Sequence, residues 1–395
     1  MADEDDMVTL VAVGDIFPTG QYPDEVFNPT RPILKGADLS FGQLEAILSR
    51  RGSRQLFATG GGANKMPVGG TGMPRLYELY DRADPDVGAQ ALSNAGFNIM
   101  SFASNHTMDL SEEAMFDTIN VLKNKSITVI GAGKNIEEAR RPAIFELKGA
   151  RVGFLAYCSV GIPGSQATED ISGVAPVRAT TSYEQFDWQP GAPPKILTRT
   201  NPEDLTGMVE DIKKLRPQVD ALVVSMHWGV HFVPALIADY QFEAGHAAID
   251  AGADLIIGHH PHILKGIEVY KGKVIFFSLC NFSFTSLKFL PTRAAGRYWF
   301  SAREYRFEVD PSHPNYKYPI DSQKTILVKC NISKKGIERV TYLPLWVNTK
   351  GQPEPVSRSD LRSDEHYRYM EWMCGSQGLD TKFSREVDEV VVLTK

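Results

Sequence analysis

Cysteine is scarce in this chain and follows no pattern. Four cysteines occur in 395 residues, at positions 158, 280, 330 and 374, and no C-x-x-C pair or short repeated spacing joins them. Scattered cysteines are typical of free core thiols in a protein from a reducing compartment. We therefore expect no disulfide framework.

Blocks of charge of one sign are also missing. The chain has 42 Lys and Arg against 48 Asp and Glu, a formal net charge of -6, and neither sign forms a long run. A protein that binds nucleic acid usually carries a basic stripe or patch. The charge pattern therefore predicts no nucleic-acid partner.

Long apolar runs are absent as well. The first residues, MADEDDMVTL, lack the basic and apolar regions of a signal peptide, and no apolar run approaches the roughly 20 residues of a membrane span. We expect a cytoplasmic protein without a membrane span. The P-loop pattern G-x-x-x-x-G-K-[ST] is missing too, which argues against ATP-driven ligation by this chain alone. Nothing in the composition predicts an oligomeric state.

What the chain does have is an alternation of short apolar runs with longer segments of helical pattern. Apolar strands separated by helices predict an α/β sheet covered on both faces, and hairpins add antiparallel pairing. We expect strands at residues 8–13, 97–103, 127–130, 221–226 and 255–257, helices at 86–94, 111–124, 202–215, 236–251 and 360–374, and hairpins at 143–157, 267–278 and 325–346.

Local signals support some of these boundaries. Gly96 is expected to end one helix, and Ser111 is expected to cap the next, with Glu112 and Glu113 in its first turn. The Gly-rich residues 60–72 and the Arg-, Tyr- and Pro-rich residues 293–319 are predicted to be loops. We expect one domain over residues 1–290 and a C-terminal extension, 291–395, packed on it near the site.

A cluster of histidines stands out at the end of one predicted strand. The motif GHHPH occupies residues 258–262, directly after the apolar run 253–257. Other polar residues follow the other predicted strands, and because ligands of open α/β sheets bind outside the carboxyl ends of the strands, these side chains are expected to meet. They are Asp15, Asn105, His106, His227, His259, His260 and His262, and Glu45 is expected to follow a further short strand directly before it. In an extended segment His260 and His262 would face one side and His259 the other.

This set of side chains predicts a metal centre. Carboxylate, amide and imidazole ligands without thiolate suit Mn²⁺, Zn²⁺ or Fe²⁺, and a single zinc ion needs only three protein ligands. The surplus favours two divalent ions, which would polarise a substrate oxygen and activate water. The remaining histidines are assigned ordinary structural roles; they are His231, His246, His313 and His366.

These residues, in this order, resemble the CapA family of poly-γ-glutamate capsule biosynthesis proteins, a branch of the calcineurin-like metallophosphoesterase superfamily. The resemblance spans about residues 8–284. It rests on the segments VAVGDI, FGQLEAIL, SFASNHTMDL, HWGVHF and AIDAGADLIIGHHPHILKGIEVYKGKVIFFSLCNF.

The resemblance implies a four-layer α/β/β/α sandwich with a dinuclear metal centre. Asp15, Asn105, His227, His260 and His262 match metal ligands, and Glu45 matches the bridging acidic residue. His106 matches the histidine that acts as an acid or stabilises charge beside the metals, and Asp109 would orient it. His259 stands where many relatives carry glycine.

Three positions depart from the family pattern. The superfamily usually begins Asp-x-His, but Ile16 and Phe17 follow Asp15, so one imidazole is missing. Glu45 replaces the usual bridging aspartate, and Gln43 replaces the asparagine common in CapA proteins. These departures weaken the case for phosphoester hydrolysis.

Three reactions remain open for such a centre. The resemblance favours a peptide or poly-γ-glutamate-like amide substrate, the wider superfamily suggests a phosphoesterase, and some CapA-like proteins are peptide epimerases. A non-enzymatic assembly subunit is the fourth alternative. We assign His259, Arg293 and Arg297 to substrate binding. The two arginines lie in a basic and aromatic stretch that also holds Tyr298, Arg303 and Tyr305, and such a stretch suits an acidic peptide or polymer.

Overall fold

The computed structural model describes most of the chain. The described residues are 7–18, 23–52, 84–187, 191, 194–284, 309–314, 316 and 318–394. The predicted loop 60–72 lies outside them, and so do the proposed substrate contacts Arg293, Arg297, Tyr298, Arg303 and Tyr305.

The larger of two central sheets has ten strands and is mixed. Along its main path the order is β19-β20-β17-β16-β1-β2-β3-β4, with β15 also paired to β1 and β18 to β17. Neighbouring strands among β1 to β4 are parallel, whereas β16 runs antiparallel to β1. The strands are β1 (Val8–Phe17), β2 (Leu39–Leu44), β3 (Ile99–Ser101), β4 (Thr128–Ile130), β15 (Asn281–Phe284), β16 (Lys324–Ser333), β17 (Gly336–Val347), β18 (Pro353–Pro355), β19 (Lys382–Glu386) and β20 (Glu389–Leu393).

The second sheet has six strands in the order β13-β14-β12-β11-β7-β6. Its parallel centre is β14, β12, β11 and β7, and the hairpins β13–β14 and β6–β7 close both edges. The strands are β6 (Ala143–Leu147), β7 (Ala150–Cys158), β11 (Ala221–His227), β12 (Leu255–His259), β13 (Ile267–Tyr270) and β14 (Lys273–Phe276).

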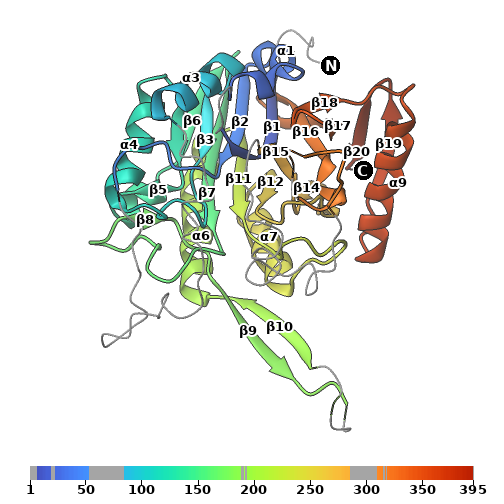
Figure 1. The fold of residues 1–395 in the computed structure, drawn as a ribbon. Helices are drawn as coiled ribbons and strands as arrows, with labels where there is room; N and C mark the ends of the chain where they lie inside the picture. The colour runs from blue at the N-terminus through green and yellow to red at the C-terminus, as the bar shows by residue number, and fades with distance from the viewer. Residues whose placement is uncertain are drawn as a thin grey trace.

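The two sheets pack face to face, with helices on the outside (Figure 1). Alternate residues of β11 show this: Ala221 and Val223 belong to the core shared with the first sheet, whereas Leu222 and Val224 pack with α6 (Pro202–Leu215) and α7 (Asp239–Ala251). A strand exposes successive side chains on opposite faces, so both faces of this sheet are covered.

Helices α3 (Pro85–Ala95) and α4 (Glu112–Lys123) contribute Leu92 and Met115 to the core of the first sheet. The four-layer α/β/β/α arrangement predicted for this chain is therefore confirmed. The shorter helices are α1 (Arg31–Gly36) and α5 (Ile136–Ala139), and α9 (Leu361–Ser376) lies beside the C-terminal strands (Figure 1). No helix within the described ranges is both long enough and apolar enough to cross a membrane.

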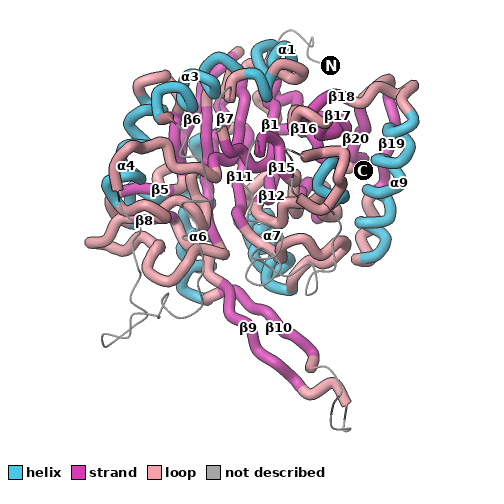
Figure 2. Tube along the Cα trace, in the orientation of Figure 1, coloured by secondary structure: helices cyan, strands magenta, loops and turns pink. Residues whose placement is uncertain are grey.

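Most predicted elements are present, but several details differ, and the hairpin β19–β20 was not predicted. Gly96 ends α3 with a φ of 104°, as expected, but Ser111 has a φ of 111° and its side chain makes no capping hydrogen bond to α4. Strand β1 continues to Phe17, so Asp15 lies inside the strand and not beyond it. The residues around 160–195 were not expected to form strands, yet β9 (Ala179–Glu184) and β10 (Lys195–Thr200) form a hairpin that projects from the body (Figure 2).

Candidate metal centre

The strand ends bring the predicted polar residues together between the two sheets. Asp15 lies near the end of β1, Glu45 follows β2, and Asn105 and His106 follow β3. His227 ends β11, and the GHHPH motif ends β12 and continues past it. Because these strands are parallel within each sheet, their carboxyl ends share one edge.

Two glycines allow the backbone to approach closely at this edge. The N–H of Asp15 donates a 3.0 Å hydrogen bond to the carbonyl of Cys280, and a Cβ on Gly14 would lie only 1.8 Å from that oxygen. A Cβ on Gly258 would lie 2.3 Å from the carbonyl oxygen of Phe277. Glycine is therefore required at both positions, because any side chain there would collide with the backbone of residues 277–280.

Glu45 is shared by two groups of candidate ligands. Asp15, Glu45 and His262 form one group, and Glu45, His227 and His260 form the other; within each group the ligand atoms lie within 4.8 Å of one another. Oε1 of Glu45 is 3.5 Å from Nε2 of His227 and 3.8 Å from Nε2 of His262. A carboxylate between two ligand groups has the arrangement that a bridging ligand of two ions requires.

Asn105 extends the second group. Its Oδ1 lies 2.7 Å from Nε2 of His227, so both atoms point toward the same place. The amide oxygen and the imidazole nitrogen are both ligand types that divalent transition metals accept.

Unpartnered polar atoms show that the residues fit a pair of cations. Asp15 and Glu45 are at most 1% exposed, yet Oδ1 of Asp15 and both carboxylate oxygens of Glu45 have no hydrogen-bond partner among the described residues. Nδ1 of His227 and Nδ1 of His260 are equally unsatisfied. Burying carboxylates without partners costs several kcal/mol, a penalty that bound metal ions remove.

The electrostatics of the protein alone point the same way. Burial, together with the neighbouring Glu45 carboxylate, raises the pKa of Asp15 well above its usual value, and burial also raises the pKa of Glu45. Burial lowers the pKa of His227, His260 and His262. These three imidazoles are therefore neutral, the form in which histidine binds a metal.

His106 differs from the other histidines. Burial by itself lowers its pKa, but the carboxylates of Asp109 and Glu45 outweigh burial and raise the pKa to about 9. Nδ1 of His106 donates a 2.7 Å hydrogen bond to Asp109, and Nε2 lies 3.9 Å from Glu45. In the protein alone, His106 is thus a cationic imidazole beside the ligand groups, and it is part of neither.

A chain of hydrogen bonds that the sequence did not predict supports His262. Nδ1 of His262 donates to Oδ1 of Asn281 at 2.7 Å, and Asn281 donates to the hydroxyl of Tyr316 at 2.9 Å. Tyr316 in turn donates to the carbonyl of Ser322. Since Nδ1 is occupied in this way, Nε2 of His262 stays available toward Glu45.

The GHHPH motif is not extended beyond His259. His260 has a φ of 94° and His262 a φ of 56°, both in the left-handed region, so the expectation that simple strand alternation turns them to one side is wrong. His259 is fully buried: its ring lies 6.0 Å from that of Phe41, and its Nδ1 lies 3.7 Å from Oδ1 of Asp15. It stands behind the ligand groups, within the core.

His231 was assigned an ordinary structural role, but the structure brings it to the centre. Its ring centroid lies 3.8 Å from that of His260 and 5.2 Å from that of His262. The adjacent Phe232, with a φ of 56°, stacks on His262 at 5.6 Å. The signal in the sequence was HWGVHF, in which His231 follows His227 by four residues.

The other three histidines lie away from the centre. His246 pairs with Glu268 at 2.9 Å, His366 bonds the carbonyl of Thr325 at 2.9 Å, and His313 lies 2.9 Å from Asp310.

The loop that carries His231 is braced by the C-terminal helix. Oε1 of Gln377, which follows α9, accepts from the N–H of Ile237 at 3.0 Å, and its Nε2 donates to the carbonyl of Ala235. Lys265 donates to the carbonyl of Val233, and burial lowers the pKa of this lysine to about 7. Residues far along the chain therefore set the position of one wall of the centre.

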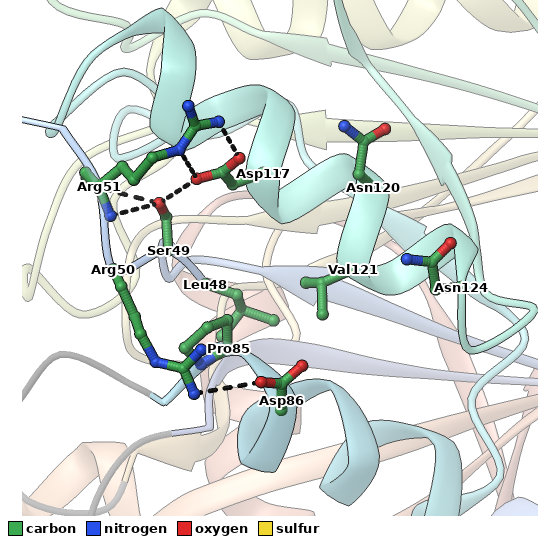
Figure 3. A pocket seen from close by; sticks show the side chains of 10 residues that line it. All are labelled: Leu48, Ser49, Arg50, Arg51, Pro85, Asp86, Asp117, Asn120, Val121 and Asn124. Atoms are coloured by element: carbon green, nitrogen blue, oxygen red, sulfur yellow. Dashed lines mark hydrogen bonds and ion pairs between the residues drawn. The ribbon is translucent and has the colours of Figure 1, made fainter.

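Two surface cavities, of about 340 Å³ and 320 Å³, have different linings from the metal centre. In the first, shown in Figure 3, Arg51 pairs with Asp117 and Arg50 pairs with Asp86. The second lies beside α5 and α6 and holds Arg140 with Asp211. Since these arginines already pair with carboxylates, neither cavity offers a strong anion site.

Comparison with known proteins places the chain in a family. The family model described as bacterial capsule synthesis protein PGA_cap matches residues 6–286, and the chain belongs to this family. The predicted resemblance to CapA proteins is thereby confirmed. The match ends before β16, so the C-terminal strands and α9 lie outside it.

Individual relatives share about 30% or less of their aligned residues with this chain. The chain is 28% identical over 367 residues to "PGA biosynthesis protein CapA" of Bacillus subtilis, covering 91% of this chain and 76% of the relative. It is 27% identical over 298 residues to "Capsule biosynthesis protein CapA" of Bacillus anthracis, covering 71% and 61%. A "Probable polyglutamine synthesis accessory protein" of Mycobacterium tuberculosis is 31% identical over 201 residues, covering 50% and 47%. The chain thus spans less than two thirds of the last two relatives.

Solved structures give only weak likenesses. A hypothetical protein from Thermus thermophilus is similar with a TM-score of 0.39 and 12% identity, over 88% of this chain and 98% of that one. The calcineurin-like phosphoesterase YfkN from Bacillus subtilis is similar with a TM-score of 0.36 and 11% identity, over 93% and 98%.

Proposed function

We propose that this chain is a metal-dependent enzyme of the hydrolase type that cleaves an amide bond in a peptide or poly-γ-glutamate-like substrate. The observation that carries the proposal is the position of Glu45, a buried carboxylate shared by two groups of ligand atoms. A purely structural carboxylate in the core would have hydrogen-bond donors, and neither oxygen of Glu45 has one among the described residues.

The proposed ligands divide between two ions. Asp15, Glu45 and His262 would hold the first, and Glu45, Asn105, His227 and His260 would hold the second. Carboxylate, amide and imidazole suit Mn²⁺, Zn²⁺ or Fe²⁺. Two such ions, when bound, polarise a substrate oxygen and make water more acidic.

The protein's own acid is His106 in this proposal. Its imidazolium holds a proton at Nε2, on the side of the ring that faces Glu45, while Nδ1–H is fixed by Asp109. A proton donor in this position can protonate the amine that leaves when an amide bond is cleaved. Asp109 orients His106 and does not itself contact the ligand groups.

The substrate class rests on the relatives and on composition. Two relatives are named as capsule or PGA biosynthesis proteins, and a third as a polyglutamine synthesis accessory protein. An acidic polymer suits arginine contacts, and we keep Arg293 and Arg297 as proposed substrate contacts; His259, which is fully buried behind the ligand groups, is no longer assigned to the substrate.

Metal analysis and a substrate screen test the proposal together. Protein purified without chelator should contain about two equivalents of divalent metal, and His260→Ala should lose metal while His246→Ala, a histidine outside the centre, should not. γ-Glutamyl amide cleavage should stop on chelation and return with metal. Full activity without metal would end the proposal. Exclusive phosphoester cleavage, or inversion of a stereocentre without cleavage, would replace the reaction but keep the centre.

A further inference from the structure

The β9–β10 hairpin is a two-stranded sheet that pairs with no other strand of the described chain. It extends away from the body, as Figures 1 and 2 show. Its base is held by α7, where Thr198 and Thr200 donate backbone N–H bonds to Asp239 at 3.2 Å and Glu243 at 2.8 Å. An isolated two-stranded ribbon is at best marginally stable in water, and no strand of the described residues adds to the projecting part.

The two faces of the hairpin differ in chemistry. Tyr183 lies opposite Ile196 and Thr181 opposite Thr198, so these four uncharged side chains share one face. The other face carries the charged pair Glu184 and Lys195. Tyr183 is 69% exposed and Ile196 is 59% exposed, which leaves a large aromatic and a branched apolar side chain in water.

Only one edge of the hairpin is open. The N–H groups of Thr198 and Thr200 point away from β9 and are used by α7, so the outer edge of β10 is blocked at its base. Since Thr181 is opposite Thr198, its own N–H must point away from β10, and with a period of two so must those of Ala179 and Tyr183. No strand in the described part of the chain pairs with this edge of β9.

This open edge has none of the usual protection. Edge strands of monomeric proteins normally carry lysine, proline or a bulge that blocks pairing with another molecule. Residues 179–183 read ATTSY, with no charge and no proline, and their pairing with β10 is regular. The edge is therefore suited to bind another strand.

We propose that β9 pairs antiparallel with β9 of a second copy of this chain, about a twofold axis at Thr181. In this register the outward-facing N–H and C=O groups of residues 179, 181 and 183 pair with those of the second copy. A twofold axis at residue 179 or 183 would pair only part of the strand, whereas the axis at Thr181 pairs residues 179–183 throughout. It sets Ala179 against Tyr183 of the partner subunit and Arg178 against Glu184 of the partner subunit, so that no like charges meet. Arg178 already pairs with Asp204 at 2.6 Å, so it adds no strong ion pair to the dimer. Its position opposite a carboxylate only means that no like charges repel each other there.

The product is a continuous four-stranded sheet in the order β10, β9, and then β9 and β10 of the partner. Directly opposite residues lie on one face, so the uncharged faces of the two hairpins join and Tyr183 packs beside Ala179 of the partner subunit. Sheets of three or more strands with an apolar face are stable where single hairpins are not. This one contact explains why the edge of β9 is open, why Tyr183 is exposed in the single chain and how the two-stranded hairpin is stabilised.

Single cysteines test the register in the full-length protein. In Thr181→Cys the two thiols face each other across the axis, at a Cα separation of about 5.5 Å, which a disulfide can span. In the control Thr180→Cys the residue opposite is Ser182 of the partner subunit, and the two cysteines are about 7–8 Å apart, too far to bridge. The four native cysteines are buried and do not interfere.

Mild oxidation should convert Thr181→Cys into a covalent dimer on a non-reducing gel, roughly ten times faster than Thr180→Cys. Equal rates for the two variants would overturn the proposal.

Sedimentation of the unmodified chain provides an independent test. It should show a reversible dimer that Thr181→Pro abolishes, because proline removes an edge N–H that has no partner among the described residues, while Thr181→Val, which keeps the N–H, should still dimerise. Unchanged thermal unfolding of both variants will show that the fold is intact. A wild-type chain that remains monomeric at every concentration would overturn the proposal, and the hairpin would then serve a different partner.

Discussion

Asp109 accepts a 2.7 Å hydrogen bond from Nδ1 of His106, three residues earlier in the same turn. This contact separates His106 from the other histidines of the centre, because it stabilises the cationic form while burial keeps His227, His260 and His262 neutral. The cationic His106 is suited to donate a proton, whereas the neutral His227, His260 and His262 are suited to bind metal.

Replacing His106 with asparagine should leave the metal content unchanged and reduce turnover. Because His106 belongs to neither ligand group, only the proton transfer is lost, and kcat should fall by roughly 10²–10⁴-fold. Asp109→Asn should cause a smaller loss, since the imidazole remains but is less well oriented. Metal content measured on the same preparations is the control, and a His106→Asn protein without metal would show that His106 is a ligand.

Replacing Glu45 with alanine should remove both metal ions, whereas His260→Ala or His262→Ala should mainly weaken one. The reason is that Glu45 belongs to both ligand groups and each histidine to one. Elemental analysis should therefore give well under one equivalent for Glu45→Ala and about one for each histidine variant.

Thermal unfolding gives a readout of the same centre that does not depend on activity. Bound metal stabilises the folded state, so a chelator should lower the Tm of the wild-type chain but not that of Glu45→Ala. His246→Ala, whose ring pairs with Glu268 elsewhere, should respond to the chelator as the wild type does. A wild-type Tm that is insensitive to chelator would argue against metal at this site.

His366 should make the fold sensitive to acid. Burial lowers the pKa of its imidazole to about 4, from 6.5 in the unfolded chain, and the ring bonds the carbonyl of Thr325. As the pH falls below 6.5, His366 becomes protonated in the unfolded chain but stays neutral in the folded chain until about pH 4. The free energy of unfolding therefore falls across this window. The loss amounts to about 2 kcal/mol between about pH 7 and pH 5.

His366→Gln separates this effect from other acid-sensitive groups. Glutamine keeps an N–H that can reach the carbonyl of Thr325 but does not titrate. Urea unfolding of both proteins at the two pH values should therefore show that the variant loses about 2 kcal/mol less than the wild type. Equal losses would mean that His366 is neutral in both states or charged in both.

Removing the side chain of Gln377 should loosen the loop that carries His231. Gln377 satisfies the N–H of Ile237 and the carbonyl of Ala235, so Gln377→Ala leaves two backbone groups without a protein partner, at a cost of about 1–3 kcal/mol. Amide hydrogen exchange should accelerate in residues 229–237. Gln377→Glu should also accelerate this exchange, because a carboxylate cannot donate to the carbonyl of Ala235. Gln352→Ala is the control: the native Gln352 bonds the carbonyl of Glu25 elsewhere, so its removal should leave the exchange of residues 229–237 unchanged.

The residues at the strand ends could be selected from the sequence because their positions follow from local rules. A polar residue at the end of an apolar strand, repeated over several strands, must come to one edge of the sheets when the strands are parallel. That rule was enough to place Asp15, Asn105, His227 and the histidines of GHHPH near one another. It could not predict that β1 continues through Asp15 or that His260 and His262 adopt positive φ, since these features depend on contacts with β15 and with the neighbouring loops.

His231 and the β9–β10 hairpin show a second kind of limit. The loop after β11 has no periodic pattern, and its course is set by Gln377 and Lys265, which are distant in sequence. The hairpin strands carry threonine, serine and charged residues with little apolar alternation, so the pattern that identifies a half-buried strand is weak there.

The sequence by itself determined the α/β class, the order of most strands and helices, and the set of ligand-type residues, because hydrophobic periodicity and strand-end position are local properties of a chain. Tertiary structure alone decided that His106 is cationic while its neighbours are neutral and that His231 joins the centre, and it placed Glu45, which only the family resemblance had marked as a bridge, between two ligand groups. These outcomes depend on distances of a few ångströms, some between residues more than a hundred positions apart and one between His106 and Asp109 in a single turn, and on the burial that the fold creates. Neither quantity is written in any short stretch of sequence.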